Sequence, residues 1–182
     1  MIDTFSHPAS AASDAAARYV QSLLDLLGDR DPIEVQSRLA TSLERATAGL
    51  SPVQLRQPEK PGKWSVIEVV QHLADSEIVT GYRIRLILAG DTPAIPAYDQ
   101  DAWAQRLRYV ATSLPDAVEQ TRLLRLRLLE LLRGLRPDEW ERAGMHSERG
   151  RESVRQITKL QAGHDLLHLR QIERIKSAIG AA

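Results

Sequence analysis

Apolar residues recur every three or four positions along most of the chain, the spacing that places them on one face of an α-helix. No segment alternates apolar and polar residues as a half-buried β-strand does, so we predict a helical bundle without a sheet. Two shorter helices are expected, one from Ser13 or Asp14 to Gly28 and one around residues 99–108. The four long helices that the pattern predicts cover residues 32–49, 65–89, 114–133 and 154–179.

The starts of the long helices carry local sequence signals. Asp31-Pro32 supplies an N-cap residue followed by proline at the first helical position. Ser65 and Glu68 have the spacing of a capping box, in which each residue satisfies a free backbone N–H of the other. The connections that are predicted to be loops cover residues 51–63, 91–112 and 136–152, with the short helix inside the second.

Length and composition set the domain organisation. A chain of 182 residues with 43% hydrophobic content can bury one sizeable core. We therefore predict an all-α fold, a four-helix bundle domain at residues 32–182. A tail and an additional helix are expected to precede it at residues 1–31.

The charge balance argues against a nucleic-acid or membrane partner. Lys plus Arg and Asp plus Glu number 24 each, so no overall field attracts phosphate or anionic lipid. The run Arg122, Arg125 and Arg127 is a candidate basic patch, although basic residues at this spacing are more typical of a solvated helix face. We expect a small-molecule substrate instead.

The chain contains no cysteine, which excludes disulfides, thiolate metal ligands and a cysteine nucleophile. Any thiol chemistry would therefore need a thiol from the substrate or a cofactor. The first thirty residues lack the pattern of a secretory signal, and no segment has the apolar length of a membrane span. We expect the chain in the cytoplasm.

His164 and His168 form an HxxxH pair, whose spacing stacks two imidazoles on one face of a helix. The same face carries Ile157, Leu160 and Ile172, so both histidines belong to an apolar stripe where an unpaired imidazole is costly to bury. Either a metal ion or ordinary hydrogen bonds could satisfy them. The pair alone does not decide between these alternatives.

His72 strengthens the metal interpretation, because it lies among Val69, Leu73 and other apolar residues of a different helix. Three neutral imidazoles suit zinc or nickel best, with iron or manganese as further candidates, and they leave coordination positions for water or substrate. The alternative is that three separate histidines each satisfy a contact between helices.

Two segments of the chain resemble the DinB/YfiT-like superfamily of proposed metal-dependent enzymes. They are residues 61–77, PGKWSVIEVVQHLADSE, with Arg83 beyond them, and residues 162–172, AGHDLLHLRQI. The resemblance extends over about residues 32–179, so the N-terminal helix lies outside it.

The resemblance implies a four-helix bundle with a long crossover, often dimeric, and a metal ion bound by three histidines. Those ligand positions fall on His72, His164 and His168. Characterised relatives include transferases and isomerases that use a low-molecular-weight thiol, while many members have no established reaction. We therefore expect a homodimer.

Arg83 and His146 are the candidate catalytic residues outside the metal site. Arg83 could bind a substrate carboxylate, but a salt bridge with Glu77 or Asp75 explains it equally well. His146, in the loop before the last helix, could serve as an auxiliary acid or base, or it could be a surface histidine. Glu68 could border the same cavity as His72, although the capping box already accounts for it.

Further polar and aromatic residues have structural explanations. Asp75 and Gln161 could hold the imidazole tautomers of a metal site from behind. We expect Trp64 and Trp140 to anchor the core rather than to stack on a substrate. His7 has no role in this interpretation.

Two classes of function fit these observations. In the first, a trihistidine centre activates water or a small thiol, as in a metal-dependent hydrolase or a thiol-dependent S-transferase. In the second, a metal ion only stabilises a helical bundle or a dimeric interaction protein. A site with an open position favours the first class and a closed site favours the second.

Overall fold

The computed structural model of the chain describes residues 13–181, so His7 lies outside the described residues. Within this range the chain forms eight α-helices. They are α1 (Ser13–Leu27), α2 (Pro32–Ser37), α3 (Leu39–Thr47), α4 (Pro52–Arg56), α5 (Val66–Ala89), α6 (Gln100–Arg106), α7 (Leu114–Arg133) and α8 (Val154–Ala178). Three short strands accompany them: β1 (Ala94–Ile95), β2 (Ala143–His146) and β3 (Gly150–Ser153).

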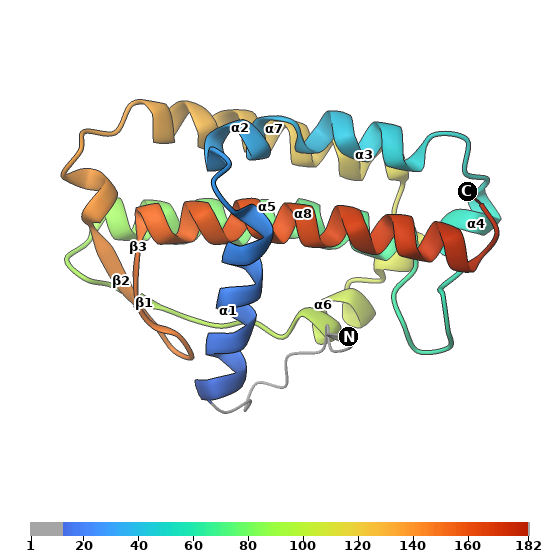
Figure 1. Cartoon of the computed structure of the whole chain (residues 1–182), viewed down its shortest axis with the longest axis horizontal. Helices are drawn as coiled ribbons and strands as arrows, with labels where there is room; N and C mark the ends of the chain where they lie inside the picture. The colour runs from blue at the N-terminus through green and yellow to red at the C-terminus, as the bar shows by residue number, and fades with distance from the viewer. Residues whose placement is uncertain (1–12, 182) are drawn as a thin grey trace.

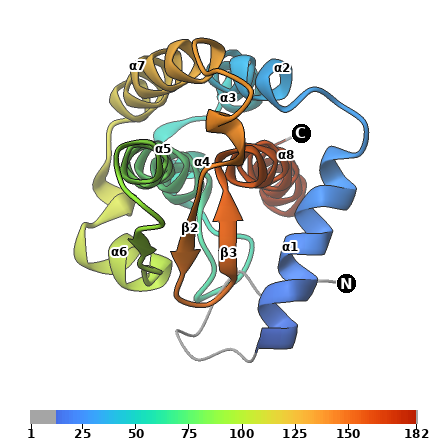
Figure 2. The same ribbon diagram turned by 90° about the vertical axis from the view of Figure 1, so that its left-hand side faces the viewer.

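The long helices form a bundle whose length runs horizontally in Figure 1. Seen from its end in Figure 2, α5 and α8 lie side by side, and α7 and the α2–α3 pair cover one side of them. Contacts between α5 and α8 confirm that the helices predicted near residues 65–89 and 154–179 are neighbours. The four-helix bundle with an additional N-terminal helix is thus confirmed.

The bundle buries two apolar clusters with a polar layer between them. One cluster contains Val69 and Leu73 of α5 and Ile172 and Ile175 of α8. The other contains later residues of α5 and earlier residues of α8: Ile84, Ile87, Val154 and Ile157. Between them the same two helices bury polar side chains, namely Ser76, Glu77, Thr80, Gln161, His164, Asp165 and His168. A buried polar layer is costly unless its groups find partners.

The predicted helix at residues 32–49 is divided into α2 and α3 at Arg38, whose backbone has φ −96° and ψ −6°. No proline or glycine marks this break, so the apolar spacing continued across it in the sequence. The predicted loop at residues 51–63 contains the short helix α4, which starts with a capping box between Ser51 and Gln54.

The prediction of a bundle without a sheet is wrong, because the connections at residues 91–99 and 142–153 form a small one. In it β2 pairs antiparallel with β3 and parallel with β1, and Ile95 lies opposite His146. The strands have two to four residues, too few to show alternation in the sequence. This sheet fixes both connections at one end of the bundle.

Helix α1 crosses the outer face of α8 rather than joining the bundle (Figures 1 and 2). The crossing depends on Gly163, where an added Cβ would lie 2.2 Å from the carbonyl oxygen of Leu23. Only glycine allows the two backbones to approach so closely. Whether residues 1–31 form a unit separate from the bundle stays a prediction. None of the described helices is long and apolar enough to cross a membrane.

Candidate metal centre

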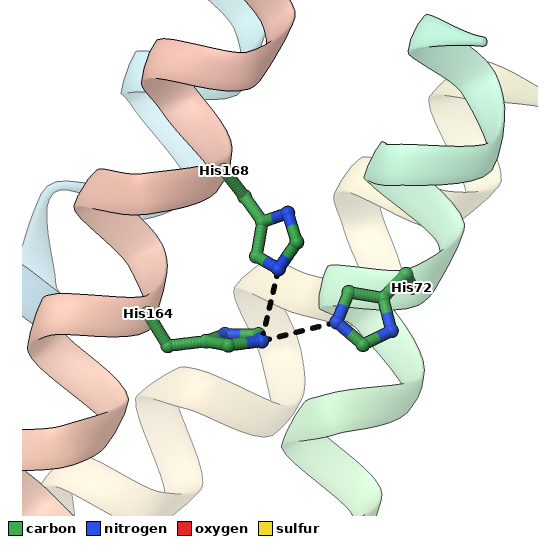
Figure 3. A group of neighbouring side chains, drawn as sticks. All are labelled: His72, His164 and His168. Atoms are coloured by element: carbon green, nitrogen blue, oxygen red, sulfur yellow. Dashed lines mark hydrogen bonds between the residues drawn. The ribbon is translucent and has the colours of Figure 1, made fainter. Parts of the chain in front are cut away.

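Three imidazoles meet in the polar layer of the bundle, as Figure 3 shows. His72 comes from α5, whereas His164 and His168 lie one turn apart on α8. The Nε2 atom of His164 lies 3.0 Å from the Nε2 atoms of both His72 and His168. One ring nitrogen of each residue lies within 4.8 Å of the others. The structure thus brings together the three histidines that the sequence singled out.

Hydrogen bonding alone cannot satisfy this arrangement. A neutral imidazole nitrogen carries either one lone pair or one hydrogen, so it makes one full hydrogen bond. The Nε2 atom of His164 has two imidazole nitrogens at 3.0 Å and can bond fully to only one of them. A cation between the rings removes the conflict, because all three lone pairs can then point towards it.

The spacing of the nitrogens also suits a metal ion. Bonds of about 2.1 Å that meet at about 90–110° separate two ligand nitrogens by about 3.0–3.4 Å. Two of the three separations are 3.0 Å, and the third stays within 4.8 Å. The spacing of the three nitrogens is therefore compatible with a shared ion.

All three imidazoles are held in the neutral form that binds metals. Burial holds the pKa of His72 well below its ordinary value, and the neighbouring His168 adds to the effect. Burial likewise holds the pKa of His164 well below the ordinary value. For His168, burial lowers the pKa to about 4, although the hydrogen bond with Gln171 opposes the shift. A lone pair is consequently available on each ring at neutral pH.

Of the Nδ1 atoms of the three histidines, only one has a hydrogen-bond partner among the described residues. The Nδ1 atom of His168 lies 2.7 Å from the side-chain oxygen of Gln171, which directs Nε2 of the same ring towards the other histidines. Among the described residues, the Nδ1 atoms of His72 and His164 are buried without a hydrogen-bond partner. The sequence did not identify Gln171, although it stands one helical turn after His168.

The expectation that Asp75 and Gln161 hold the imidazoles is wrong. The carboxylate of Asp75 accepts hydrogen bonds from Tyr109 at 2.7 Å and from two glutamine side chains. Gln161 accepts from Thr80 and donates to Ser76 and Glu77. Both residues are buried in the polar layer, but their hydrogen bonds connect helices rather than orient a ligand.

Arg125 of α7 is buried in the polar layer, so the prediction of a solvated basic run is correct for only two of its three arginines. Arg122 and Arg127 are exposed as expected, whereas Arg125 is only 3% exposed. Its guanidinium forms ion pairs with Glu77 of α5 and Asp165 of α8 and donates to the backbone oxygen of Gln36 in α2. One side chain thus links all four helices of the bundle.

The sequence did contain a signal for Arg125. It continues a stripe of buried positions on α7, after Ala117 and Thr121 and before Leu128 and Leu132. A charged residue in such a stripe needs partners of opposite charge on neighbouring helices. Burial, together with the neighbouring Glu77, raises the pKa of Asp165 to about 6, although Arg125 opposes the shift.

A cavity of about 170 Å³ lies on the side of α5 and α8 that α7 does not cover. His164 lines it, and this residue keeps 9% of its surface exposed whereas His72 is fully buried. The lining also includes Ala16, Tyr19, Val20 and Leu23 of α1 and Ser76, Thr80 and Arg83 of α5, with Tyr98 and His146 at the sheet. The trihistidine group therefore borders a cavity at one of its three members.

Arg83 lines this cavity, but its predicted salt bridge with Glu77 or Asp75 is wrong. Glu77 is paired with Arg125, and the carboxylate of Asp75 accepts hydrogen bonds from Tyr109 and two glutamines. Arg83 instead donates to the backbone oxygen of Pro96 at 2.7 Å, and its guanidinium lies 5.9 Å from the ring centre of Tyr98. Burial, and then the positive charge of Arg149, lower the pKa of Arg83.

His146 also lines the cavity, and the alternative that it is a surface histidine is wrong, since it is 3% exposed on β2. Its Nδ1 atom accepts a hydrogen bond from the backbone N–H of Glu148 at 3.1 Å. Burial, with Arg149 and Arg83 nearby, lowers the pKa of His146 to about 4. With this pKa the ring is neutral at pH 7 and only a weak base, and its lone pair on Nδ1 already accepts from Glu148, so a role in proton transfer is not supported.

The remaining candidates have structural roles. Glu68 accepts from the backbone N–H of Ser65 at 2.8 Å, which confirms the capping box at the start of α5. Trp64 packs against the first apolar cluster, and its ring lies 4.9 Å from that of His72, so it also covers one side of the trihistidine group. Trp140 packs against the second cluster beneath Arg155.

Comparison with known proteins connects this arrangement to a family. The sequence profile of the DinB superfamily matches residues 37–172, a segment that contains all three histidines. A relative from Oceanobacillus iheyensis, whose name proposes a metal-dependent hydrolase, is 32% identical over 71% of this chain and 75% of its own length. YfiT from Bacillus subtilis, with a name of the same kind, is 29% identical over 78% of this chain and 82% of its own length.

The solved structure of YfiT supports the fold independently. It superposes with a TM-score of 0.77 over 100% of this chain and 97% of the other, at 24% sequence identity. Its description proposes a metal-dependent hydrolase and records an unusual four-helix bundle topology. At this level of identity the superposition establishes the shared architecture, and the chemistry must be argued from the site itself.

Proposed function

Because the chain belongs to the DinB superfamily, we propose that it is a metal-dependent hydrolase whose divalent ion is held by His72, His164 and His168. The relatives whose names propose metal-dependent hydrolysis support this reaction class. Zinc and nickel are the metals that we propose first, and iron or manganese are alternatives, since imidazole suits all four. Homodimerisation and a cytoplasmic location stay predictions.

The observation that carries the proposal is the conflict at the Nε2 atom of His164. This atom lies 3.0 Å from two other imidazole nitrogens and can form a full hydrogen bond with only one of them. A buried conflict of this kind is unfavourable unless a cation resolves it. Three neutral imidazoles without a carboxylate or thiolate among them leave the ion its full positive charge, which favours the activation of water.

The surroundings of the site favour catalysis over a purely structural metal. Among the described residues, no further histidine and no aspartate or glutamate joins the three histidines, and His164 borders the cavity. A divalent ion there would act as a Lewis acid and would acidify a coordinated water. The chain itself would exclude bulk solvent with α1 and would hold the ligand rings with Trp64 and Gln171.

A thiol-dependent S-transferase is the second candidate. The chain has no cysteine, so no thiolate of its own competes for an open coordination position. A small external thiol would enter the same cavity. Hydrolase and transferase therefore share the site and differ in the nucleophile, which is water in one case and a thiolate in the other.

Metal analysis of protein purified without a histidine tag tests the assignment of the ligands. We expect one divalent ion per chain, and we expect His72→Ala, His164→Ala and His168→Ala each to lose most of it. His146→Ala is the matched control, because His146 is buried at the same cavity but stands outside the trihistidine group. Full metal content in all three ligand variants would refute the site.

Removal of the ion and a survey of substrates then distinguish a catalytic role of the metal from a structural one. We expect a chelator to lower the melting temperature and zinc to restore it, because a ligand that binds only the folded state stabilises it. Hydrolysis of small esters or amides that depends on the metal supports the hydrolase. Turnover that requires an added thiol supports the transferase, and thermal stabilisation without any turnover favours the structural alternative.

A further inference from the structure

His146 carries a buried N–H group without a partner. Its Nδ1 atom accepts a hydrogen bond from the backbone N–H of Glu148, so Nδ1 must hold the lone pair of the ring. In the neutral imidazole the proton then lies on Nε2, which is a donor. Among the described residues, nothing accepts a hydrogen bond from Nε2. An unpaired buried donor is costly, and His146 borders the cavity, so a ligand acceptor can satisfy it.

Arg83 supplies positive charge at the same end of the cavity. Its guanidinium donates to the backbone oxygen of Pro96, next to Ile95, and Ile95 lies opposite His146 in the small sheet. Within the described part of the chain, no carboxylate lies within ion-pair distance of Arg83. Since the Pro96 oxygen uses only part of the five N–H groups of an arginine, the others are available to a ligand.

The other charged groups around the cavity have partners or contact with solvent. Arg149 has a carboxylate partner in Glu152, with which it forms two hydrogen bonds at 2.6 and 2.9 Å. Asp99 is exposed and caps α6 by accepting from the backbone N–H of Ala102. Glu148, in the turn between β2 and β3, is partly exposed, so water screens its charge. Of the described residues that line the cavity, Arg83 is therefore the cation that lacks a carboxylate partner.

We propose that Arg83 and His146 form a subsite for an oxyanion group of the substrate, either a carboxylate or a phosphate. Arg83 provides charge and hydrogen bonds, and the Nε2–H of His146 provides one further donor of fixed direction. The subsite rests on the proposed function insofar as it places the reacting bond at His164, which lines the same cavity. Both residues bind the substrate and neither transfers a proton.

The neutral state of His146 supports this role. Because burial and nearby arginines lower the pKa of the ring to about 4, the proton stays on Nε2 throughout the neutral range. The cavity is partly open, so its volume of about 170 Å³ limits only the part of the substrate that lies inside it. The substrate class is therefore a compound that carries a carboxylate or phosphate group together with a bond that water can cleave.

Equilibrium binding of three ring compounds of similar size tests the subsite. The probes are benzoate, phenyl phosphate and benzamide, added to the metal-loaded protein and to protein stripped by a chelator. We expect benzoate or phenyl phosphate to bind in both states, and the comparison between them identifies the preferred oxyanion. Benzamide has no negative charge and should bind about 10- to 100-fold more weakly, the usual worth of a hydrogen bond to a charged group.

Substitutions of Arg83 and His146 test whether these two residues bind the anion. Arg83→Met and His146→Phe should each weaken binding of the preferred anion about 10- to 100-fold while the metal content stays unchanged. Arg155→Met is the matched control, because Arg155 is an exposed arginine stacked on Trp140 away from the cavity. Equal affinity of the wild-type protein for benzamide and the anions, or unchanged affinity in both variants, overturns the proposal.

A measurement on the wild-type protein tests the subsite even if the variants do not fold. Nitrogen chemical shifts of the His146 ring should report a neutral Nε2–H tautomer, and the Nε2 signal should move when the anion is added. A protonated Nδ1, or an Nε2 signal indifferent to saturating anion, overturns the proposal.

The outcomes also separate this proposal from the proposed function. Anion binding that requires the metal and ignores Arg83→Met locates the anion on the ion, which refutes the subsite and leaves the metal site intact. Anion binding that depends on Arg83 and His146 in a protein that takes up no metal supports the subsite and refutes the proposed hydrolase.

Discussion

Replacement of Arg125 by methionine would leave two carboxylates in the interior of the bundle without their cation. In the intact protein the five N–H groups of Arg125 all have acceptors. Nε and one Nη2 hydrogen reach Glu77, the other Nη2 hydrogen and one of Nη1 reach Asp165, and the last reaches the backbone oxygen of Gln36. Methionine fills a similar volume and provides none of these bonds.

The expected cost follows from the burial of the partners. The side chains of Glu77 and Asp165 are 0% and 1% exposed, so water cannot replace the guanidinium. Removal of one partner from a buried ion pair costs about 3–5 kcal/mol. For a protein of this size that corresponds to a fall in melting temperature of about 6–20 °C, a large part of the about 5–15 kcal/mol that stabilises a typical domain.

Urea unfolding of a double-mutant cycle measures the effect. Glu77→Gln alone should destabilise the protein, because it removes one of the two charges that face Arg125. In the Arg125→Met background the same substitution should cost much less, or even stabilise, because it relieves an unpaired buried charge. Arg122→Met is the control. Arg122 pairs with Glu119 on the exposed face of α7, and its loss should change stability by less than about 0.5 kcal/mol.

Additive effects in this cycle would refute the reasoning. If Arg125→Met cost no more than Arg122→Met, or if the two substitutions added to within about 0.5 kcal/mol, the buried network would contribute little. The links between α7 and the two helices that carry the histidines would then depend on apolar packing alone.

Two further predictions concern the cavity walls. Gly163→Ala should lower stability by about 1–3 kcal/mol and increase proteolytic cleavage within α1, because the new methyl group overlaps the backbone of Leu23. Gly81→Ala, whose new methyl group would meet only the flexible end of Arg85, should be neutral or stabilising, and equal losses in both variants would refute the close approach. The difference in stability between the wild type and His146→Phe should be constant above about pH 6.5 and should shift in favour of the variant as the pH falls towards 4, because the folded pKa of about 4 lies below that of an unfolded histidine. A difference independent of pH, measured by urea unfolding across this range, would contradict the buried neutral state of His146.

The parts of the molecule that the sequence predicted correctly are those that depend on long periodic patterns. The four long helical segments were recognisable, and their apolar stripes identified the face on which His164 and His168 lie. His72 could be assigned to the same site because its own helix has a buried face and a capping box that fixes the start at Ser65. Geometry then brought the three rings together as expected. Their metal binding stays a prediction.

The parts that the sequence did not predict depend on contacts between segments far apart in the chain. The partner of Glu77 is an example, because the sequence suggested Arg83 and placed Arg125 in a run expected to be solvated. The packing of α7 against α5 pairs Glu77 with Arg125 instead. The small sheet was missed because strands of two to four residues carry no periodic signal. His146 appeared to be a loop histidine for the same reason, since its burial depends on that sheet.

The three histidines and one wall of the cavity come from different parts of the chain, because α1 supplies that wall. All three histidines lie within residues 37–172, the segment that matches the superfamily, whereas one wall of the cavity comes from a helix that ends at Leu27, before this segment begins. The proposed chemistry and the shape of the cavity can therefore change independently of each other. A change in α1 alters the shape of the cavity without touching a proposed ligand residue, provided that the crossing at Gly163 is kept. An activity found for a relative should be transferred to this chain only when the crossing helix also corresponds.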